Sequence, residues 1–117
     1  MKVFGVSQSS GAERELEVEG AGGGIVLTIR DHAGGAELER VLVKADDLLP
    51  AITDPAPGGC TVPGTSPAHR WKMLLTVEIR RNEVWLTARP ATAKAAVDVA
   101  VGLDDFQDAL ERAIGPA

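Results

Sequence analysis

Apolar and polar residues alternate in six runs along this chain, and the alternation predicts two groups of β-strands. A period of two places every second side chain on the same face of a sheet. The expected strands cover residues 13–19, 25–30, 37–43, 72–80, 83–89 and 95–101. Behind each group the apolar period lengthens to three and four residues, which predicts a helix. The two helices are expected at residues 46–53 and 104–114.

The two groups of elements are copies of one unit, because three short blocks recur in the same order. LEVE and LTIR of the first half return as LTVE and LTAR at an offset of 59 residues, and ADDL returns as LDDF at an offset of 58. Similar blocks in one order with a single-residue slip indicate an internal duplication.

The duplication predicts one domain, residues 1–117, with repeat one at 1–53, a linker at 54–67 and repeat two at 68–117. Proline and glycine are frequent in the linker, which has room for a short strand around 60–62; residues 2–7 predict a further strand at the N-terminus. The predicted fold class is α+β. The antiparallel strands of both units merge into a larger sheet, and both helices pack on one face of it.

Acidic pairs begin both helices, and a glycine run separates the first two strands of the hairpin in repeat one. Asp46-Asp47 and Asp104-Asp105 are interpreted as helix caps, whose carboxylates accept hydrogen bonds from the first free amides and favour the positive end of the helix dipole. The run GAGGG at residues 20–24 is interpreted as a hairpin turn rather than a phosphate-binding loop, because a strand and not a helix follows it.

Composition indicates an ordinary globular domain, with 44% hydrophobic and 25% charged residues. Cys60 is the single cysteine, so no intrachain disulfide is possible, and we expect a reduced, cytoplasmic protein. A zinc site would have to combine Cys60, His32, His69 and scattered carboxylates, so neither a metal nor a cofactor is predicted. No apolar run is long enough to span a bilayer, and a membrane partner is not expected.

The chain lacks a Walker loop, a dinucleotide fingerprint, a nucleophile elbow and an HExxH motif, so we predict a non-enzymatic protein. The formal net charge of −5 opposes general attraction to phosphate backbones. That charge is unevenly distributed: residues 1–59 carry 5 Lys/Arg and 10 Asp/Glu, residues 60–94 carry 6 and 2, and residues 95–117 carry 1 and 5. The positive excess falls on the hairpin of repeat two.

In that hairpin, alternation places Trp85 on the face opposite the apolar residues that form the core. Lys72, Arg80 and Arg89 share the face of Trp85, and Arg81 lies in the turn. An aromatic ring flanked by cations on an open sheet is typical of single-stranded nucleic acid binding, where bases stack and phosphates meet cations. The candidate nucleic-acid-binding residues are therefore Lys72, Arg80, Arg81, Trp85 and Arg89. Packing of Trp85 against a loop or in a dimer contact is the alternative.

The stretch LLTVEIRRNEVWLTARP, followed by AAVDVAVGLDDFQDALERAI, resembles the superfamily that includes positive cofactor four, the Whirly proteins and the Pur-alpha repeats. This resemblance implies a curved antiparallel sheet followed by a helix, duplicated or dimerised, and a role in binding single-stranded DNA or RNA. The first repeat departs from the family pattern, because glutamates occupy its sheet face. A homodimer is also expected, and a protein-interaction or self-assembly module is the alternative function. A small ligand on the concave side of the sheet remains a third possibility.

Overall fold

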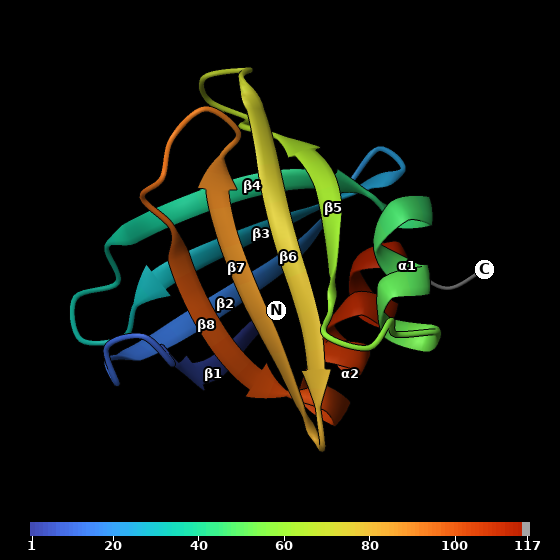
Figure 1. Ribbon diagram of the computed structural model, residues 1–117, viewed down its shortest axis with the longest axis horizontal. Helices are drawn as coiled ribbons and strands as arrows, with labels where there is room; N and C mark the ends of the chain where they lie inside the picture. The colour runs from blue at the N-terminus through green and yellow to red at the C-terminus, as the bar shows by residue number, and fades with distance from the viewer. Residues whose placement is uncertain (116–117) are drawn as a thin grey trace.

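Eight strands form a closed antiparallel barrel, seen in Figure 1 with two helices at one end. The computed structural model describes residues 1–115, and residues 116 and 117 of the second repeat lie outside the described part. The strands are β1 (Lys2–Val6), β2 (Glu13–Ala21), β3 (Gly24–Asp31), β4 (Glu37–Lys44), β5 (Cys60–Thr65), β6 (Lys72–Arg80), β7 (Glu83–Pro90) and β8 (Val97–Gly102). The helices are α1 (Ala45–Thr53) and α2 (Leu103–Ile114).

The elements expected from the periodicity are confirmed. Every alternating run is a strand, both helical patterns are helices, and each bound lies within about two residues of its expected position. The N-terminal strand is present as β1. The strand expected around residues 60–62 is longer, because β5 continues to Thr65.

The predicted α+β sheet with both helices on one face is wrong. The expected linker supplies β5, so residues 1–53 and residues 60–114 each contain four strands and a helix. These two units join along two edges, β1 with β8 and β4 with β5, so that the sheet closes on itself. Closure pairs the edge strands that an open sheet would leave exposed to other chains. Alternation specifies the inward face equally well in an open sheet and in a barrel, so the pattern alone did not distinguish them.

One core fills the barrel, and the helices cover its end. The inward residues of the strands share this core with Leu48 and Ile52 of α1 and with Phe106 and Leu110 of α2. In Figure 1 both helices lie at the end of the barrel where β2, β4, β6 and β8 terminate. We call this the helix end and the opposite end the loop end. Ile114 is 50% exposed, so the apolar stripe of α2 ends before the last residue that the pattern included.

Both seams of the barrel depend on a glycine at equivalent positions of the repeat. Gly5 pairs with Val101 across the β1–β8 seam, and Gly64 pairs with Val43 across the β4–β5 seam. A Cβ atom at Gly5 would lie 2.5 Å from the carbonyl oxygen of Ala100, and one at Gly64 would lie 2.8 Å from that of Leu42. Only a residue without a side chain lets these strands approach so closely.

The aspartate pairs do not cap the helices with their side chains, so that prediction is wrong. Neither N-terminus has a side-chain capping hydrogen bond, although both acidic pairs do lie in the first turn, where they favour the helix dipole. The first amide of each helix instead donates to a hairpin turn: Ala45 to the Gly23 carbonyl at 3.4 Å, and Leu103 to the Asn82 carbonyl at 2.7 Å. The two hairpins therefore position the helices in the same way.

Candidate nucleic-acid interface

Each repeat builds the same six-residue loop at the loop end of the barrel. In the β1–β2 loop the Ser7 amide donates to the Ala12 carbonyl at 2.8 Å, and in the β5–β6 loop the Ser66 amide donates to the Trp71 carbonyl at 2.9 Å. Each serine hydroxyl also accepts the amide of the fourth loop residue, and each serine carbonyl accepts the amide of the fifth. The backbone frame is thus duplicated along with the strands.

The side chains on the two frames differ in kind. The β1–β2 loop and its next residue carry Ser10-Gly11-Ala12-Glu13, whereas the second copy carries His69-Arg70-Trp71-Lys72, which we call the HRWK segment. Trp71 is 48% exposed, and its ring stacks on that of His69 with centroids 4.2 Å apart and planes 21° apart. The second repeat therefore presents a preformed aromatic stack to solvent.

Arg70 occupies a backbone conformation that disfavours a side chain. Its φ angle is 62°, and its counterpart Gly11 has a φ angle of 76°. The left-handed region costs a non-glycine residue about 1–2 kcal/mol. A strained residue at an exposed loop tip is a reason to look for a function of its side chain, because the fold itself would be served better by glycine.

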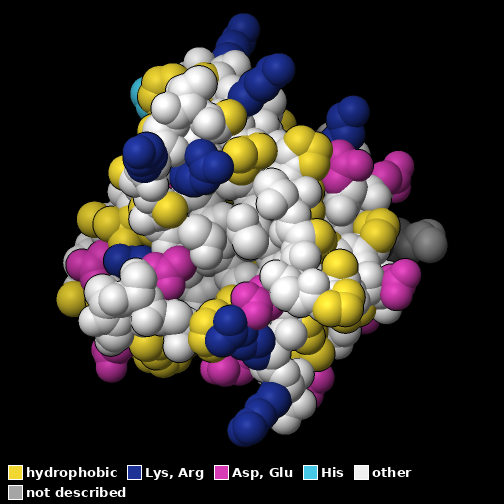
Figure 2. Space-filling view, in the orientation of Figure 1, with side chains coloured by type: hydrophobic (Ala, Val, Ile, Leu, Met, Phe, Trp, Pro, Cys, Tyr) yellow, Lys and Arg dark blue, Asp and Glu magenta, His cyan; other side chains and the backbone are white. Residues whose placement is uncertain are grey.

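The surroundings of the HRWK segment are positively charged. Residues 55–77 and 84–97 contain no aspartate or glutamate, and they supply Arg70, Lys72, Arg89 and Lys94. The β7–β8 loop lies next to Lys72, since the Ala91 amide donates to the Lys72 carbonyl at 2.9 Å. Figure 2 shows Lys and Arg side chains over these two loops at the top of the view, with no acidic side chain visible among them.

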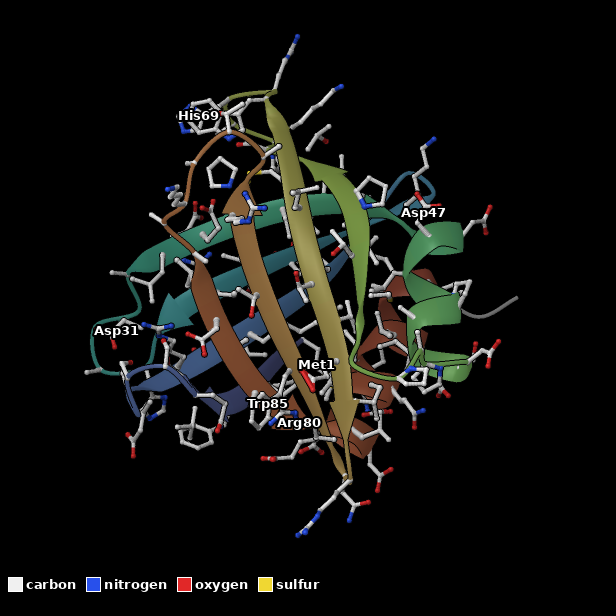
Figure 3. All side chains as sticks on the ribbon, viewed as in Figure 1. Met1, Asp31, Asp47, His69, Arg80 and Trp85 are labelled. Atoms are coloured by element: carbon white, nitrogen blue, oxygen red, sulfur yellow. The ribbon has the colours of Figure 1, made fainter. Side chains whose placement is uncertain are left out.

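The predicted stacking residue, Trp85, lies at the opposite end of the β6–β7 hairpin and is partly covered. The Arg80 guanidinium carbon lies 3.8 Å from the centroid of its ring, a cation–π contact. Glu78 forms a salt bridge with Arg80 and so holds it there. Figure 3 shows Trp85 and Arg80 together near the helix end and His69 near the loop end. Trp85 is therefore a half-buried ring with a cation already on it.

The other predicted site residues are divided between the two ends. Lys72 belongs to the loop end, where it continues the HRWK segment, and Arg81 lies in the β6–β7 turn with a φ angle of 55°. Arg89 donates to the carbonyls of the β7–β8 loop, the shortest bond being 3.0 Å to Ala93, and so orders that loop. The structure thus joins Arg80 with Trp85 and leaves Lys72 near the far end of the same strand.

The sequence analysis names His69 only as a possible zinc ligand, and it does not include Arg70 or Trp71 among the candidate site residues. A signal for them exists in the sequence, because VFGVS at residues 3–7 matches VPGTS at 62–66 at the same offset of 59. If the alignment of the two repeats is extended through these blocks, the HRWK segment at residues 69–72 aligns with SGAE at residues 10–13. The substitution of small residues by cations and aromatics is then visible without a structure.

The first repeat carries the opposite charge on the matching face. Glu13, Glu15, Glu17 and Glu19 occupy the alternate outward positions of β2. Burial raises the pKa of Glu17, but the hydrogen bond and charge of Arg30, 3.1 Å away, lower it more, so that the pKa lies below its usual value. Glu15 lies 3.0 Å from His32. The outward face of β2 is therefore more acidic than the matching face of β6.

The surface of the barrel is hollowed near the helices. Two open depressions of about 520 and 530 Å³ lie at the helix end around the glycine turn of residues 22–24, which is a hairpin turn as predicted. Within residues 1–115, His, Cys, Asp and Glu side chains form no group of three that would hold a metal ion. In the same residues, no helix has both the length and the apolar character needed to cross a membrane.

Comparison of the chain with family models, with curated proteins and with solved structures finds no match in any of the three. The resemblance to the Whirly, positive cofactor four and Pur-alpha superfamily therefore stays a prediction.

Proposed function

We propose that the protein is a non-enzymatic binding domain for single-stranded nucleic acid, with the loop end of the second repeat as its binding surface. The exposed Trp71 ring, stacked on His69, is the observation that carries the proposal. A base stacks on an exposed indole whatever its identity, because every base has a π-face. The single cysteine agrees with a cytoplasmic location for such a domain.

The charges around Trp71 fit a phosphate backbone. Arg70, Lys72 and Lys94 are exposed, and their two loops, which contain no carboxylate, meet through the hydrogen bond from the Ala91 amide to the Lys72 carbonyl. Phosphates that meet these cations release counterions, so affinity falls as salt rises. Among the described residues, the hydrogen bonds made by the loop 66–71 join residues of the same loop. The side chains of Arg70 and Trp71 take no part in them, so they are free for a ligand.

Replacing Trp71 with alanine is expected to weaken binding of a fluorescein-labelled oligothymidylate by about tenfold or more, because one stacked base contributes about 1–3 kcal/mol. Fluorescence anisotropy at low salt measures the dissociation constant. The matched control is Phe4→Ala, since Phe4 is a 52% exposed aromatic on the first repeat and should not affect binding.

Equal affinity of the wild type and of Trp71→Ala would contradict the site. Absence of binding at low salt would contradict the function itself. If light scattering then showed a stable dimer, the alternative function, self-association, would be supported instead.

Arg70→Gly is expected to change stability and binding in opposite directions. Glycine accepts the left-handed φ, so the free energy of unfolding should rise by about 0.5–1 kcal/mol in a urea titration. The lost cation should weaken oligonucleotide binding and reduce the slope of log affinity against log salt by about one. A less stable variant would show that Arg70 is needed by the loop itself and is not retained for a ligand.

A further inference from the structure

The two tryptophans of the chain lie at opposite ends of the β6–β7 hairpin, Trp71 in the loop before β6 and Trp85 on the outer face near the β6–β7 turn. Trp85 pairs across the ladder with Glu78, seven residues beyond Trp71. At about 3.3 Å per residue the backbone positions of Trp71 and Glu78 are about 23 Å apart along the strand. A ligand of several nucleotides that stacks on Trp71 has this face within reach.

The second repeat does not have the row of glutamates that covers the outward face of β2 in the first repeat. Alternate outward positions of β2 carry Glu13, Glu15, Glu17 and Glu19, and the equivalent positions of β6 carry Lys72, Leu74, Thr76 and Glu78. Three of the four carboxylates are thus replaced. The centre of the ladder is a Thr76–Thr87 pair, whose hydroxyls carry no charge that would repel a phosphate.

The carboxylates that remain near this face have partners. Glu78 is bound by Arg80, and Glu83 lies 3.5 Å from the indole nitrogen of Trp85. Asp98, which pairs with Thr87, accepts hydrogen bonds from Ser7 and Ser9 and forms a salt bridge with Arg14. Arg89 and Arg80 lie on the ladder, and Arg81 adjoins it in the turn. The face between the tryptophans is therefore neutral to positive.

From this arrangement we infer that the β6–β7 face is a track for one nucleic acid strand, with Trp71 as the first stacking position and Trp85 as the second. Arg80 covers Trp85 in the free protein. A phosphate that binds Arg80 would draw the guanidinium away from the Trp85 ring, and a base could then stack on that ring. The second position is therefore available only to a strand long enough to extend from Trp71 to Arg80. The inference rests on the proposed function and adds the path and the minimum length of the ligand.

The fluorescence of the two stacking positions can be measured separately, because the chain contains two tryptophans and no tyrosine. Trp85→Phe leaves Trp71 as the sole indole, and Trp71→Phe leaves Trp85 while keeping an aromatic ring in the loop. Each is titrated with oligothymidylates of about 3 and about 16 nucleotides, the longer matching the upper site size of single-strand binding folds. Labelled-oligonucleotide anisotropy confirms occupancy in every case.

We expect both oligonucleotides to quench Trp71 in the Trp85→Phe protein. In the Trp71→Phe protein only the long oligonucleotide should change Trp85 fluorescence. A Trp85 signal that stays constant while anisotropy shows the long strand bound would overturn the track and leave the proposed function intact. Absence of binding by anisotropy in both variants and in the wild type would overturn the proposed function as well.

A charge variant tests the path independently of fluorescence. Arg80→Ala should weaken binding of the long oligonucleotide by a few fold and leave the short one unchanged. The matched control, Arg112→Ala, removes the same charge from the exposed face of α2 and should change neither. Equal effects of the two variants on the long strand would show general electrostatic attraction and contradict a track along β6–β7.

Discussion

Replacing Gly5 with alanine should lower the free energy of unfolding by about 2–3 kcal/mol, because the new methyl group is forced against backbone at the barrel seam. Its Cβ would lie 2.5 Å from the Ala100 carbonyl oxygen and 2.6 Å from a methyl group of Val99. Only two residue pairs join β1 to β8, so the strands have few other contacts to hold the seam when Gly5 pushes them apart. For a domain of this size the melting temperature should fall by about 10 °C.

Alanine substitutions at two further glycines provide a comparison for the loss of stability expected at Gly5. Gly64→Ala should be destabilising to a slightly smaller extent, since its nearest backbone atom lies 2.8 Å from the added carbon. Gly34→Ala is the matched control, because no atom lies within 4 Å of its added carbon and its φ is not left-handed. Urea unfolding followed by circular dichroism measures all three. A Gly5→Ala protein as stable as Gly34→Ala would contradict a closed β1–β8 seam.

Asp98→Asn should cost about 2 kcal/mol at neutral pH, since its carboxylate ties the β1–β2 loop to β8. It accepts hydrogen bonds from the hydroxyls of Ser7 and Ser9 at 2.8 and 2.7 Å and from the backbone amides of Gln8 and Ser9. Arg14 adds a salt bridge at 3.3 Å, and the Asp98 side chain is only 16% exposed. These contacts extend a seam whose strand pairing is short, and an amide replaces them incompletely.

The contribution of Asp98 should also depend on pH. Burial raises the pKa of this carboxyl, but the hydrogen bonds from Ser9, Ser7 and the loop amides lower it by a larger amount. The folded-state pKa therefore lies below the usual value. A lowered folded pKa means that the stabilisation is complete above the unfolded pKa of about 3.9 and is lost as the pH falls through the folded pKa.

The difference in unfolding free energy between wild type and Asp98→Asn should therefore be constant from about pH 6 to 8 and shrink below about pH 4. Urea titrations at several pH values measure it. Asp108→Asn is the control, because Asp108 forms only an exposed pair with Arg112 and should show a much smaller effect. A difference that stays constant down to about pH 2 would show that the carboxylate charge is not what holds the loop.

The candidate site could be predicted only in part. Alternation correctly placed Lys72, Trp85 and Arg89 on the outward face of the hairpin, since facing is a local property of a strand. It did not show that Arg80 covers Trp85, because that contact depends on a side-chain conformation that Glu78 holds. Trp71 was missed for a different reason: it lies in a loop, where no periodicity reports on exposure.

The sequence by itself determined the strands, the helices and the inward residues, because each follows from short-range periodicity. Tertiary structure alone decided that the sheet closes. Closure depends on whether β1 meets β8 and β4 meets β5, and these contacts join residues far apart in the chain through the space left by Gly5 and Gly64. Tertiary structure also decided which tryptophan is the more exposed: Arg80 covers Trp85, while a strained loop projects Trp71 into solvent.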